Sequence, residues 1–370
     1  MTVVKAWLVT AAVVLSVALG GALTWQHYVG RVGEADLLGD AGREHRGPPR
    51  QIDIQSAPRL SAGPGAGPGA DVRSRLDAEP GRNILLAGLD ARPGEDRAAA
   101  RADTVIIVHV TEPGDRAFLI SLPRDTRVAI PGHGTDKLNA AFALGGFELL
   151  ARTVQQLTGL VFDAGAIIDF AGVRKVVDAV GGVELCVDEE TTSVHIGWDA
   201  SGKETPPYRL IPPSFRPVRI AGVRAQVYRV GCRHFAGWEA LDYVRQRELI
   251  PDGDYGRQRH QQQLLRAIAE KVTSAGVVAN PIALNRAITA VGDSLTFDGN
   301  GASVTDWILR LRAIGPEDLT LLRTNAGRFH TERRDGRDYE NLDPATSALF
   351  TAARDDRLAE FARLNPSWVI

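Results

Sequence analysis

The chain has 370 residues, of which 44% are hydrophobic and 24% charged, and its formal net charge is only −2. This is the composition of an ordinary globular protein with enough apolar residues for a sizeable core, which excludes a wholly disordered chain. The length allows one large domain or two of ordinary size.

The N-terminus carries an apolar stretch from Ala6 to Leu23, eighteen residues without a charge. At 1.5 Å per residue a helix of this length crosses a bilayer, so we predict a transmembrane anchor within residues 1–29. A cleaved signal peptide is the alternative, although its apolar region usually spans only about 7–15 residues. Lys5 and Arg31 flank the stretch, and their weak charge bias favours a cytoplasmic N-terminus. The rest of the chain is then extracytoplasmic, attached to the cell membrane by a single span.

The next segment, residues 30–80, is rich in Gly, Pro and Ala and has no sustained apolar periodicity. Such a segment is typical of a flexible stalk that holds the following domain away from the membrane surface. We expect the catalytic domain in residues 81–335 and a closing helix or tail in residues 336–370.

Apolar runs of strand length alternate with helix-period segments from residue 83 onward. The first four predicted strands are 84–89, 104–110, 118–122 and 128–130. Later elements are helices at 147–158 and 173–180, a strand at 183–187, helices at 238–247, 257–272 and 305–314, a strand at 319–322 and a closing element at 349–364. Residues 188–229 are rich in Pro and Thr and predict a long excursion or hairpin. This alternation predicts an α/β fold, a mixed central sheet with helices on both faces.

The chain contains two cysteines, Cys186 and Cys232, and both lie in the part expected outside the cell. An even pair in an oxidising compartment predicts a disulfide that closes a long loop, and two buried free thiols are the alternative. His195 and His234 do not complete the short paired spacings that a zinc site requires.

Two aspartates are candidates for a metal site. Asp90 follows the first predicted strand, and Asp103 comes thirteen residues later, at the start of the second. The carboxyl ends of strands form the ligand crevice of open α/β sheets, so Asp90 is well placed to act there. Two carboxylates brought together repel unless a cation lies between them, and their oxygens suit Mg²⁺ bridging to phosphate. The alternative is that each aspartate merely caps a turn.

Basic residues also follow predicted elements. Arg124 comes directly after the third strand, in Leu-Pro-Arg-Asp, and is expected either in the same crevice or in a salt bridge at the strand end. Lys137 near a helix start is unfavourable unless an anion compensates it. Residues 243–263 hold a dense cationic cluster of Arg245, Arg247, Arg257, Arg259 and His260. Because arginine matches phosphate oxygens two at a time, the cluster suggests a phosphorylated ligand, with a solvated helix face as the alternative.

Asp254, at the start of the helix that carries Arg257, is expected to cap it and so add free backbone N–H groups to an anion site. No Walker A motif, no Gly-x-Gly-x-x-Gly after the first strand and no Gly-x-Ser-x-Gly occur. Their absence excludes the corresponding nucleotide kinases, dinucleotide enzymes and α/β-hydrolases.

Seven motifs in this order together resemble the LytR-CpsA-Psr family, over about residues 81–272. They are Asn-Ile-Leu-Leu-Ala-Gly-Leu-Asp-Ala-Arg (83–92), Arg-Ala-Asp-Thr (101–104), Leu-Pro-Arg-Asp (122–125), Lys-Leu-Asn-Ala-Ala (137–141), Val-Gly-Gly-Val (180–183), Tyr-Val-Arg-Gln-Arg (243–247) and Asp-Tyr-Gly-Arg followed by Gln-Gln (254–262). The resemblance implies a membrane-anchored enzyme of the bacterial cell surface. It implies a phosphotransferase that moves a glycopolymer, with its linking phosphate, from a polyprenyl diphosphate to peptidoglycan, at the 6-hydroxyl of muramic acid.

The resemblance also implies the roles of individual residues. The implied catalytic set is Asp90, Asp103, Arg124 and Arg247, with Mg²⁺ or Mn²⁺ held by Asp90 and Asp103. The implied diphosphate-binding set is Arg92, Arg101, Arg124, Arg245, Arg247, Arg257 and Gln261. The partners are then the lipid-linked glycopolymer, peptidoglycan and the membrane, and no nucleic acid is expected. A polyprenyl-phosphate binding or regulatory protein without turnover and a hydrolase that releases the polymer remain as alternatives.

The chain departs from the family pattern at two positions. His260 stands where the family usually has an arginine, which predicts a weaker or pH-dependent phosphate contact. Ala91 stands where serine is frequent. The prenyl tail requires an apolar tunnel, and the candidates for its wall are the helix-period residues Leu144, Leu149, Leu150, Val154 and Leu157, which are equally typical of a plain core.

Overall fold

The computed structural model describes residues 81–90, 100–211, 216–274, 294–302, 306–307, 310–311 and 314–370. The predicted anchor and stalk, in residues 1–80, lie outside these ranges. Within them, none of the helices has both the length and the apolar character needed to cross a bilayer.

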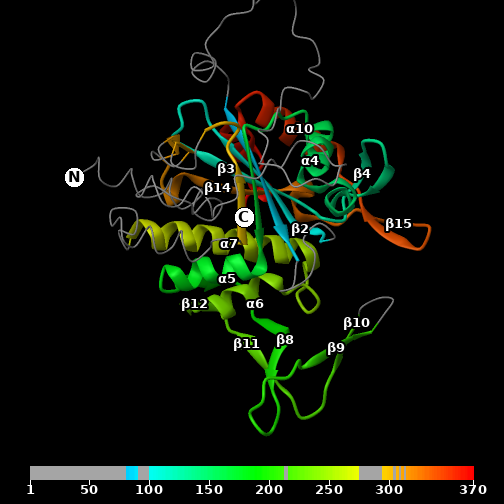
Figure 1. Ribbon diagram of the computed structural model, residues 1–370, viewed down its shortest axis with the longest axis vertical. Coiled ribbons are helices and arrows are strands. Elements are labelled where there is room, and N and C mark those ends of the chain that lie inside the picture. The colour runs from blue at the N-terminus through cyan, green and yellow to red at the C-terminus, as the bar shows by residue number, and fades with distance from the viewer. Residues whose placement is uncertain are drawn as a thin grey trace, which may run out of the picture.

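A six-stranded sheet runs through the centre of the molecule (Figure 1). In spatial order its strands are β13 (Leu295–Asp298), β6 (Ala164–Asp169), β1 (Arg82–Leu89), β2 (Ala102–Val110), β3 (Ala117–Leu122) and β14 (Leu319–Arg323). β1 pairs antiparallel with β2 but parallel with β6, and β3 pairs antiparallel with β2 but parallel with β14. The sheet is therefore mixed, as predicted.

Helices cover both faces of this sheet because its strands are apolar on both sides. In β1, Ile84 and Leu86 belong to one core, whereas Leu85 and Leu89 belong to the other. The first core is closed by α5 (Phe170–Ala179), α6 (Gly237–Arg245) and α7 (Gly253–Ser274), and the second by α4 (Leu138–Thr158), α10 (Pro344–Arg354) and α11 (Leu358–Leu364). The predicted α-β-α layering is confirmed, and the predicted closing element at 349–364 is α10 and α11.

One helix, α4, is interrupted at Gly145 and Gly146, where the backbone leaves the helical region. Gly146 has a φ of 65°, a conformation that a residue without a Cβ adopts freely. The helix resumes at Phe147, where the apolar periodicity predicts a helix start, and ends at the left-handed Gly159. Half of the residues of the predicted helix at 305–314 lie outside the described residues.

The predicted excursion at residues 188–229 forms a projecting pair of hairpins, here called the arm (residues 191–228; Figure 1). In it β8 (Thr191–Trp198) pairs with β11 (Arg224–Tyr228), and β9 (Tyr208–Ile211) pairs with β10 (Arg216–Arg219). The chain enters the arm from β7 (Val183–Val187) and leaves it through β12 (Gly231–Phe235), which pair antiparallel. Cys186 lies directly opposite Cys232 in this pair, and the two form a disulfide, as the sequence predicts.

A buried polar network fixes the root of the arm to α6. The Asp242 carboxylate accepts hydrogen bonds from the Tyr228 hydroxyl at 2.7 Å and the Ser193 hydroxyl at 3.0 Å. Gln246 donates to the same carboxylate and accepts from the backbone N–H of Val194 at 2.9 Å. Burial raises the pKa of Asp242, although the hydrogen bonds from Tyr228 and Ser193 favour the ionised form. The arm is therefore attached rigidly to the helix whose last residue is Arg245.

Two small hairpins lie on the other side of the molecule (Figure 1). They are β4 (Arg127–Ile130) with β5 (Gly134–Lys137), and β15 (Thr331–Arg334) with β16 (Arg337–Glu340). Glu340 is buried and joins them to α7, since it accepts from the Tyr255 hydroxyl and its backbone N–H donates to Asp125. The start of α7 is thereby fixed from two sides.

Candidate functional site

Several segments that carry the predicted site residues meet at one end of the central sheet. Because β1 and β2 are antiparallel, the end of β1 lies beside the start of β2, and the Asp90 N–H donates to the Arg101 carbonyl. Gly88 pairs with Thr104 and Leu89 with Ala102, so Asp103 is the extra residue of a bulge. A bulge changes the direction of a side chain. The end of β3, with Arg124, lies next to Asp103 on the other side, because Val105 pairs with Leu122.

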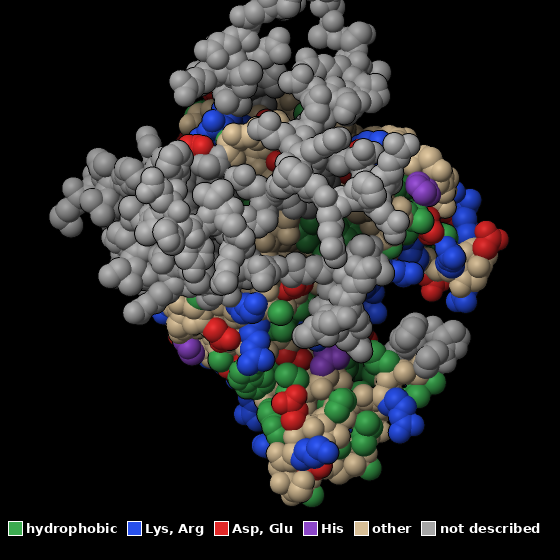
Figure 2. Space-filling view, in the orientation of Figure 1, with side chains coloured by type: hydrophobic (Ala, Val, Ile, Leu, Met, Phe, Trp, Pro, Cys, Tyr) green, Lys and Arg blue, Asp and Glu red, His purple; other side chains and the backbone are tan. Residues whose placement is uncertain are grey.

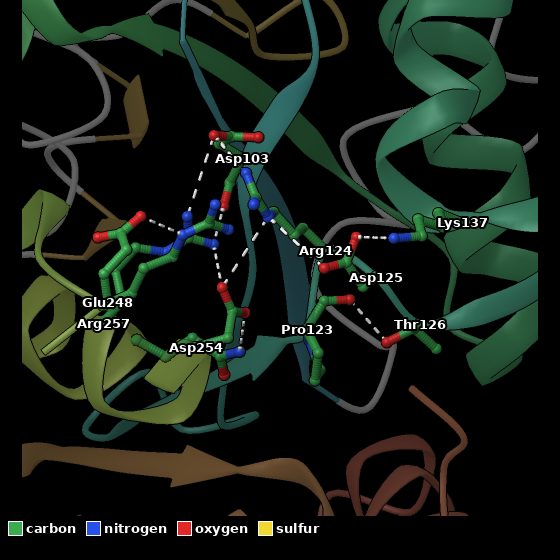
Figure 3. A network of polar contacts seen from close by, with 11 residues as sticks. Asp103, Pro123, Arg124, Asp125, Thr126, Lys137, Glu248, Asp254 and Arg257 are labelled. Atoms are coloured by element: carbon green, nitrogen blue, oxygen red, sulfur yellow. Dashed lines mark hydrogen bonds and ion pairs between the residues drawn. The ribbon is translucent and has the colours of Figure 1, made fainter. Parts of the chain in front are cut away.

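The centre of the site is a cluster of two arginines and two aspartates from three elements (Figure 3). Arg124 Nη1 lies 2.6 Å from Asp103 Oδ2, and Arg257 Nη2 lies 2.5 Å from Asp254 Oδ1. Arg257 also donates to the Asp103 carbonyl at 3.0 Å, and its Nη1 lies 3.9 Å from Asp103 Oδ2. Arg124 Nε lies 3.9 Å from Asp254 Oδ1, which closes the cluster. Motifs about 150 residues apart in the sequence thus meet in one place.

The two central guanidinium groups retain capacity for an anion. Arg257 is only 6% exposed, and within the described residues the Nε atoms of Arg124 and Arg257 are buried without a hydrogen-bond partner. Burial alone would lower the pKa of Arg124, but the carboxylates of Asp103, Asp254 and Asp125 together raise it. A buried donor without a partner is unfavourable, so a phosphate oxygen that fills this position is strongly favoured.

The end of α6 contributes two further arginines. The Arg245 guanidinium stacks over the Phe170 ring at 4.7 Å, and Arg247 Nε pairs with Glu248 Oε1 at 2.9 Å. His195, on the arm strand β8, lies within electrostatic reach of Arg245 and Asp90. Burial lowers the pKa of His195, the positive charge of Arg245 lowers it further, and Glu248 and Asp90 act in the opposite direction. The root of the arm therefore borders the site.

The other residues that the sequence predicts for the site do not all lie in the central cluster. Arg92 lies outside the described residues, and Arg101 is exposed beside Asp90. Lys137 stands at the start of α4, where the sequence predicts a compensating anion, and its Nζ pairs with Asp125 Oδ1 at 2.9 Å. The anion that compensates Lys137 is therefore a side chain of the protein itself, Asp125. Asp254 lies inside the first turn of α7 and contacts Arg257 and Arg124, so the prediction that it caps the helix backbone is wrong.

Asp90 and Asp103 are the residues at the sheet end that would hold a magnesium ion, and Asp103 Oδ2 lies 2.6 Å from Arg124 Nη1. No three His, Cys, Asp or Glu side chains gather as a metal cluster within the described part of the chain. Asp90 and Asp103 supply carboxylate oxygens from neighbouring strands, and Asp90 is exposed. Mg²⁺ is commonly bound by one or two carboxylates together with substrate phosphates and water, so two such residues suffice.

An apolar cavity with an empty volume of about 750 Å³, including its open part, lies between the sheet and α5, α6 and α7. Its lining reaches the site, because Thr104 follows Asp103, Phe170 lies under Arg245, and Gln261 is one helical turn beyond Arg257. The deeper wall is aliphatic and consists of residues such as Ile106, Val176, Leu264 and Ile268. The apolar cavity is thus lined near the arginine–carboxylate cluster by Thr104 and Gln261, and no charged residue is among those that line it.

The predicted wall residues do not line this cavity. Leu149, Leu150 and Val154 of α4 pack in the core on the opposite face of the sheet, while Leu144 is 48% exposed. Leu157 packs against that same core. The prediction was wrong because helical periodicity identifies a buried stripe and does not indicate which face of the sheet has space.

His260 does not contact the anion site. Its side chain is fully buried and stacks on the Tyr243 ring at 4.0 Å. The neighbouring Arg259 is engaged by Asp188, Asp252 and Glu189 at 2.7–3.0 Å. The expectation of a weak, pH-dependent phosphate contact through His260 is therefore wrong, and its ring forms part of the core beneath the site.

The buried ring nevertheless makes stability depend on pH. Burial, followed by the charge of Arg259, lowers the pKa of His260 to about 4 from 6.5. Between these values the unfolded chain binds a proton that the folded protein excludes, so the free energy of unfolding decreases as the pH falls. We expect a loss of about 2 kcal/mol from this group between pH 7.5 and pH 5.

Denaturant unfolding of the full chain and of the His260→Phe variant at both pH values measures this loss. Phenylalanine keeps a ring on Tyr243 and cannot titrate, so the variant should lose less stability on acidification. Other buried histidines contribute equally to both proteins. The same pH dependence in both proteins would contradict the assignment.

Some site residues were not found from the sequence. Glu248 and His195 carried no motif, and the chain brings His195 to Arg245 only through the buried network at the root of the arm. Gln262, next to Gln261, connects α7 to the sheet, because its amide donates to the Ser121 hydroxyl of β3 and the Leu322 carbonyl of β14.

The fold and site define an α/β protein with a cluster of arginines and carboxylates at one end of a mixed sheet, beside an apolar cavity. The sequence profile of the LytR_cpsA_psr family matches residues 66–344, and the chain belongs to this family. The match begins 15 residues before the start predicted for the folded domain.

Proteins similar to this chain in sequence are named as cell-wall proteins. The chain is 35% identical over 228 residues to the probable cell wall biosynthesis protein LcpB of Corynebacterium glutamicum, covering 56% of this chain and 48% of that protein. It is 32% identical over 217 residues to the polyisoprenyl-teichoic acid–peptidoglycan teichoic acid transferase TagU of Enterococcus faecalis, covering 58% of this chain and 61% of that one. The chain therefore spans about half to two thirds of the length of these relatives.

Solved structures share the fold. Protein gbs0355 from Streptococcus agalactiae superposes with a TM-score of 0.59 and 22% identity, over 78% of this chain and 91% of that one. The structure titled "TagT bound to LI-WTA" gives a TM-score of 0.54 and 23% identity, over 76% of this chain and 92% of that one.

Proposed function

We propose that this protein is an extracytoplasmic phosphotransferase. It moves a glycopolymer, with its linking phosphate, from a polyprenyl diphosphate carrier to peptidoglycan, at the 6-hydroxyl of muramic acid. The observation that carries this proposal is a buried guanidinium cluster beside an apolar cavity, whose lining includes Thr104, next to Asp103, and Gln261, one helical turn from Arg257. A diphosphate with a prenyl tail has matching chemistry. Family membership and the transferase name of the relative from Enterococcus faecalis support the same assignment.

The ligand is bound by charge at one end and by apolar contact at the other. Arg124 and Arg257 donate to the diphosphate oxygens, and Arg245, Arg247, Arg92 and Arg101 complete the cationic surroundings. Gln261 lies at the junction where the headgroup gives way to the tail. The tail enters the cavity between the sheet and α7, where it leaves water.

The reaction requires one bond to form and one to break. The acceptor hydroxyl attacks the phosphorus that carries the glycopolymer, and the bond from that phosphorus to the bridging oxygen breaks. Polyprenyl phosphate leaves with the electron pair, and a carboxylate of the site takes the hydroxyl proton. Arg124 and Arg257 stabilise the charge that grows on the leaving group, so catalysis is positioning plus electrostatics. When bound by Asp90 and Asp103, Mg²⁺ or Mn²⁺ would neutralise charge on the diphosphate.

The remaining sequence predictions belong to the same proposal. The anchor in residues 1–29 and the stalk in residues 30–80 keep the catalytic domain, residues 81–335, beside the membrane that supplies its donor. The tail at residues 336–370 closes the domain on the α4 face, where α10 packs against the core.

The test uses the full chain in detergent with Mg²⁺, a lipid-linked glycan and soluble peptidoglycan fragments. We expect a glycan–peptidoglycan product joined through phosphate, identified by mass spectrometry. Free polymer phosphate in place of this product would identify a hydrolase. Binding of the donor without either product would identify a binding protein.

A further inference from the structure

The outer hairpin of the arm, β9 with β10, has one face that is fully exposed. Cross-strand pairing places Arg209 opposite Val218 and Ile211 opposite Arg216. Because side chains alternate along a strand, these four lie on the same face, here called the hairpin face. All four are exposed, including Ile211 at 40% and Val218 at 47%. Two β-branched aliphatic side chains and two arginines are therefore presented together to solvent.

The arm carries a surplus of positive charge that the protein does not neutralise. Residues 191–228 contain five lysines and arginines and only two acidic residues, whereas the whole chain has a net charge of −2. Figure 2 shows the arm as a separate lobe with basic side chains on its surface. Within the described residues, four exposed arginines of the arm make no ion pair with a carboxylate: Arg209, Arg216, Arg219 and Arg224. Elsewhere on the described surface both states occur, since Arg152, Arg174 and Arg333 are paired whereas Arg116 and Arg363 are not.

The chemistry of the hairpin face favours an anionic lipid surface over a sugar. The two strands contain no Asp, Asn, Glu or Gln, the residues that commonly bind sugar hydroxyls. Arginine binds lipid phosphate while its stem and neighbouring aliphatic groups enter the apolar boundary. Each basic residue near an anionic leaflet contributes about 1 kcal/mol. Two arginines flanking two aliphatic residues suit that boundary.

We propose that the hairpin face of Arg209, Ile211, Arg216 and Val218 docks on an anionic lipid surface. This inference depends on the proposed function in one respect, namely that the donor substrate is a lipid. The arm is fixed to α6 by the Asp242 network and closed at its base by the disulfide. Docking of the hairpin therefore also sets the orientation of Arg245, and of the cavity mouth beside it, relative to the bilayer.

The test places a fluorescent probe on the hairpin of the full chain, reconstituted into phosphatidylglycerol vesicles. Val218→Cys is labelled with a thiol-reactive dye, which leaves the disulfide-bonded Cys186 and Cys232 unmodified. Val161→Cys is the matched control, because Val161 is equally aliphatic, is 58% exposed and lies outside the arm. Quenching by spin-labelled lipids should be roughly fivefold stronger at position 218 than at position 161.

Charge-reversal variants test whether electrostatic attraction contributes to docking of the hairpin face. The Val218 probe should lose most of its quenching in the Arg209→Glu/Arg216→Glu background and in purely phosphatidylcholine vesicles. The Arg152→Glu/Arg174→Glu background, which reverses two exposed arginines outside the arm, should leave it unchanged. Equal quenching at positions 218 and 161 would overturn the proposal. So would shielding of the Val218 probe by soluble peptidoglycan in the absence of lipid, which would identify a glycan-binding surface. Quenching does not depend on turnover, so this outcome is separate from the transfer assay.

Discussion

Replacing Arg257 with lysine lowers the rate of glycopolymer transfer by roughly 10²- to 10³-fold. Arg257 is almost completely buried and contacts Asp254 and the Asp103 carbonyl, and its Nε has no hydrogen-bond partner within the described residues. Lysine retains the charge and loses the planar fork that binds two phosphate oxygens at once. Initial rates with a lipid-linked donor give kcat and KM separately, and we expect the larger change in kcat.

The matched control is Arg259→Lys, two residues further along the same helix. Arg259 is also largely buried, but its guanidinium is held by Asp188, Asp252 and Glu189 instead of facing the site. This variant should transfer at close to the unmodified rate, with melting curves confirming that both proteins fold. Full activity of the Arg257 variant would show that the cluster does not bind the diphosphate.

Replacing Asp103 with asparagine lowers transfer by about 10²-fold and does not weaken metal-free binding of pyrophosphate. The carboxylate lies 2.6 Å from Arg124, so its removal frees a guanidinium for an anion while removing a predicted metal ligand. The two effects separate when kcat is measured across a Mg²⁺ titration and pyrophosphate binding is measured by calorimetry in a chelator. A chelator should also abolish transfer by the unmodified protein, and added Mg²⁺ should restore it.

Asp125→Asn provides the comparison for this experiment. Asp125 also borders Arg124, at 3.8 Å, but its carboxylate is committed to Lys137 at 2.9 Å and is not a predicted metal ligand. Its Mg²⁺ dependence should match that of the unmodified protein. If the Asp103 variant retains the normal rate at every Mg²⁺ concentration, the metal role assigned to Asp103 is wrong.

The sequence predicted the central strands well because each is a short apolar run that ends at a turn, as in residues 84–89 and 118–122. It placed Asp90 and Arg124 correctly at one end of the sheet because both directly follow such strands. The bulge at Asp103 could not be predicted, since it depends on the register between β1 and β2. The approach of His195 to Arg245 also depends on tertiary packing, through side chains that show no periodicity.

The position of the apolar cavity required the structure for a related reason. The periodic aliphatic residues of α4 and α7 look alike in sequence, and only packing shows which sheet face they cover. The cavity forms beside small residues such as Gly88 and Ala166, which leave space over the strands. His260 was predicted from its motif to make a weaker or pH-dependent phosphate contact, but its ring is buried and stacks on the ring of Tyr243.

The pairing of β7 with β12 places the two ends of the intervening segment next to each other, with Cα atoms of Cys186 and Cys232 only 3.8 Å apart. The outer part of such a segment can be lengthened, shortened or exchanged without displacing the framework, provided that Ser193 and Tyr228 at its root keep their hydrogen bonds to Asp242. A chimaera that replaces only the outer hairpin, β9 with β10, would therefore change what the outer lobe recognises and keep the reaction centre.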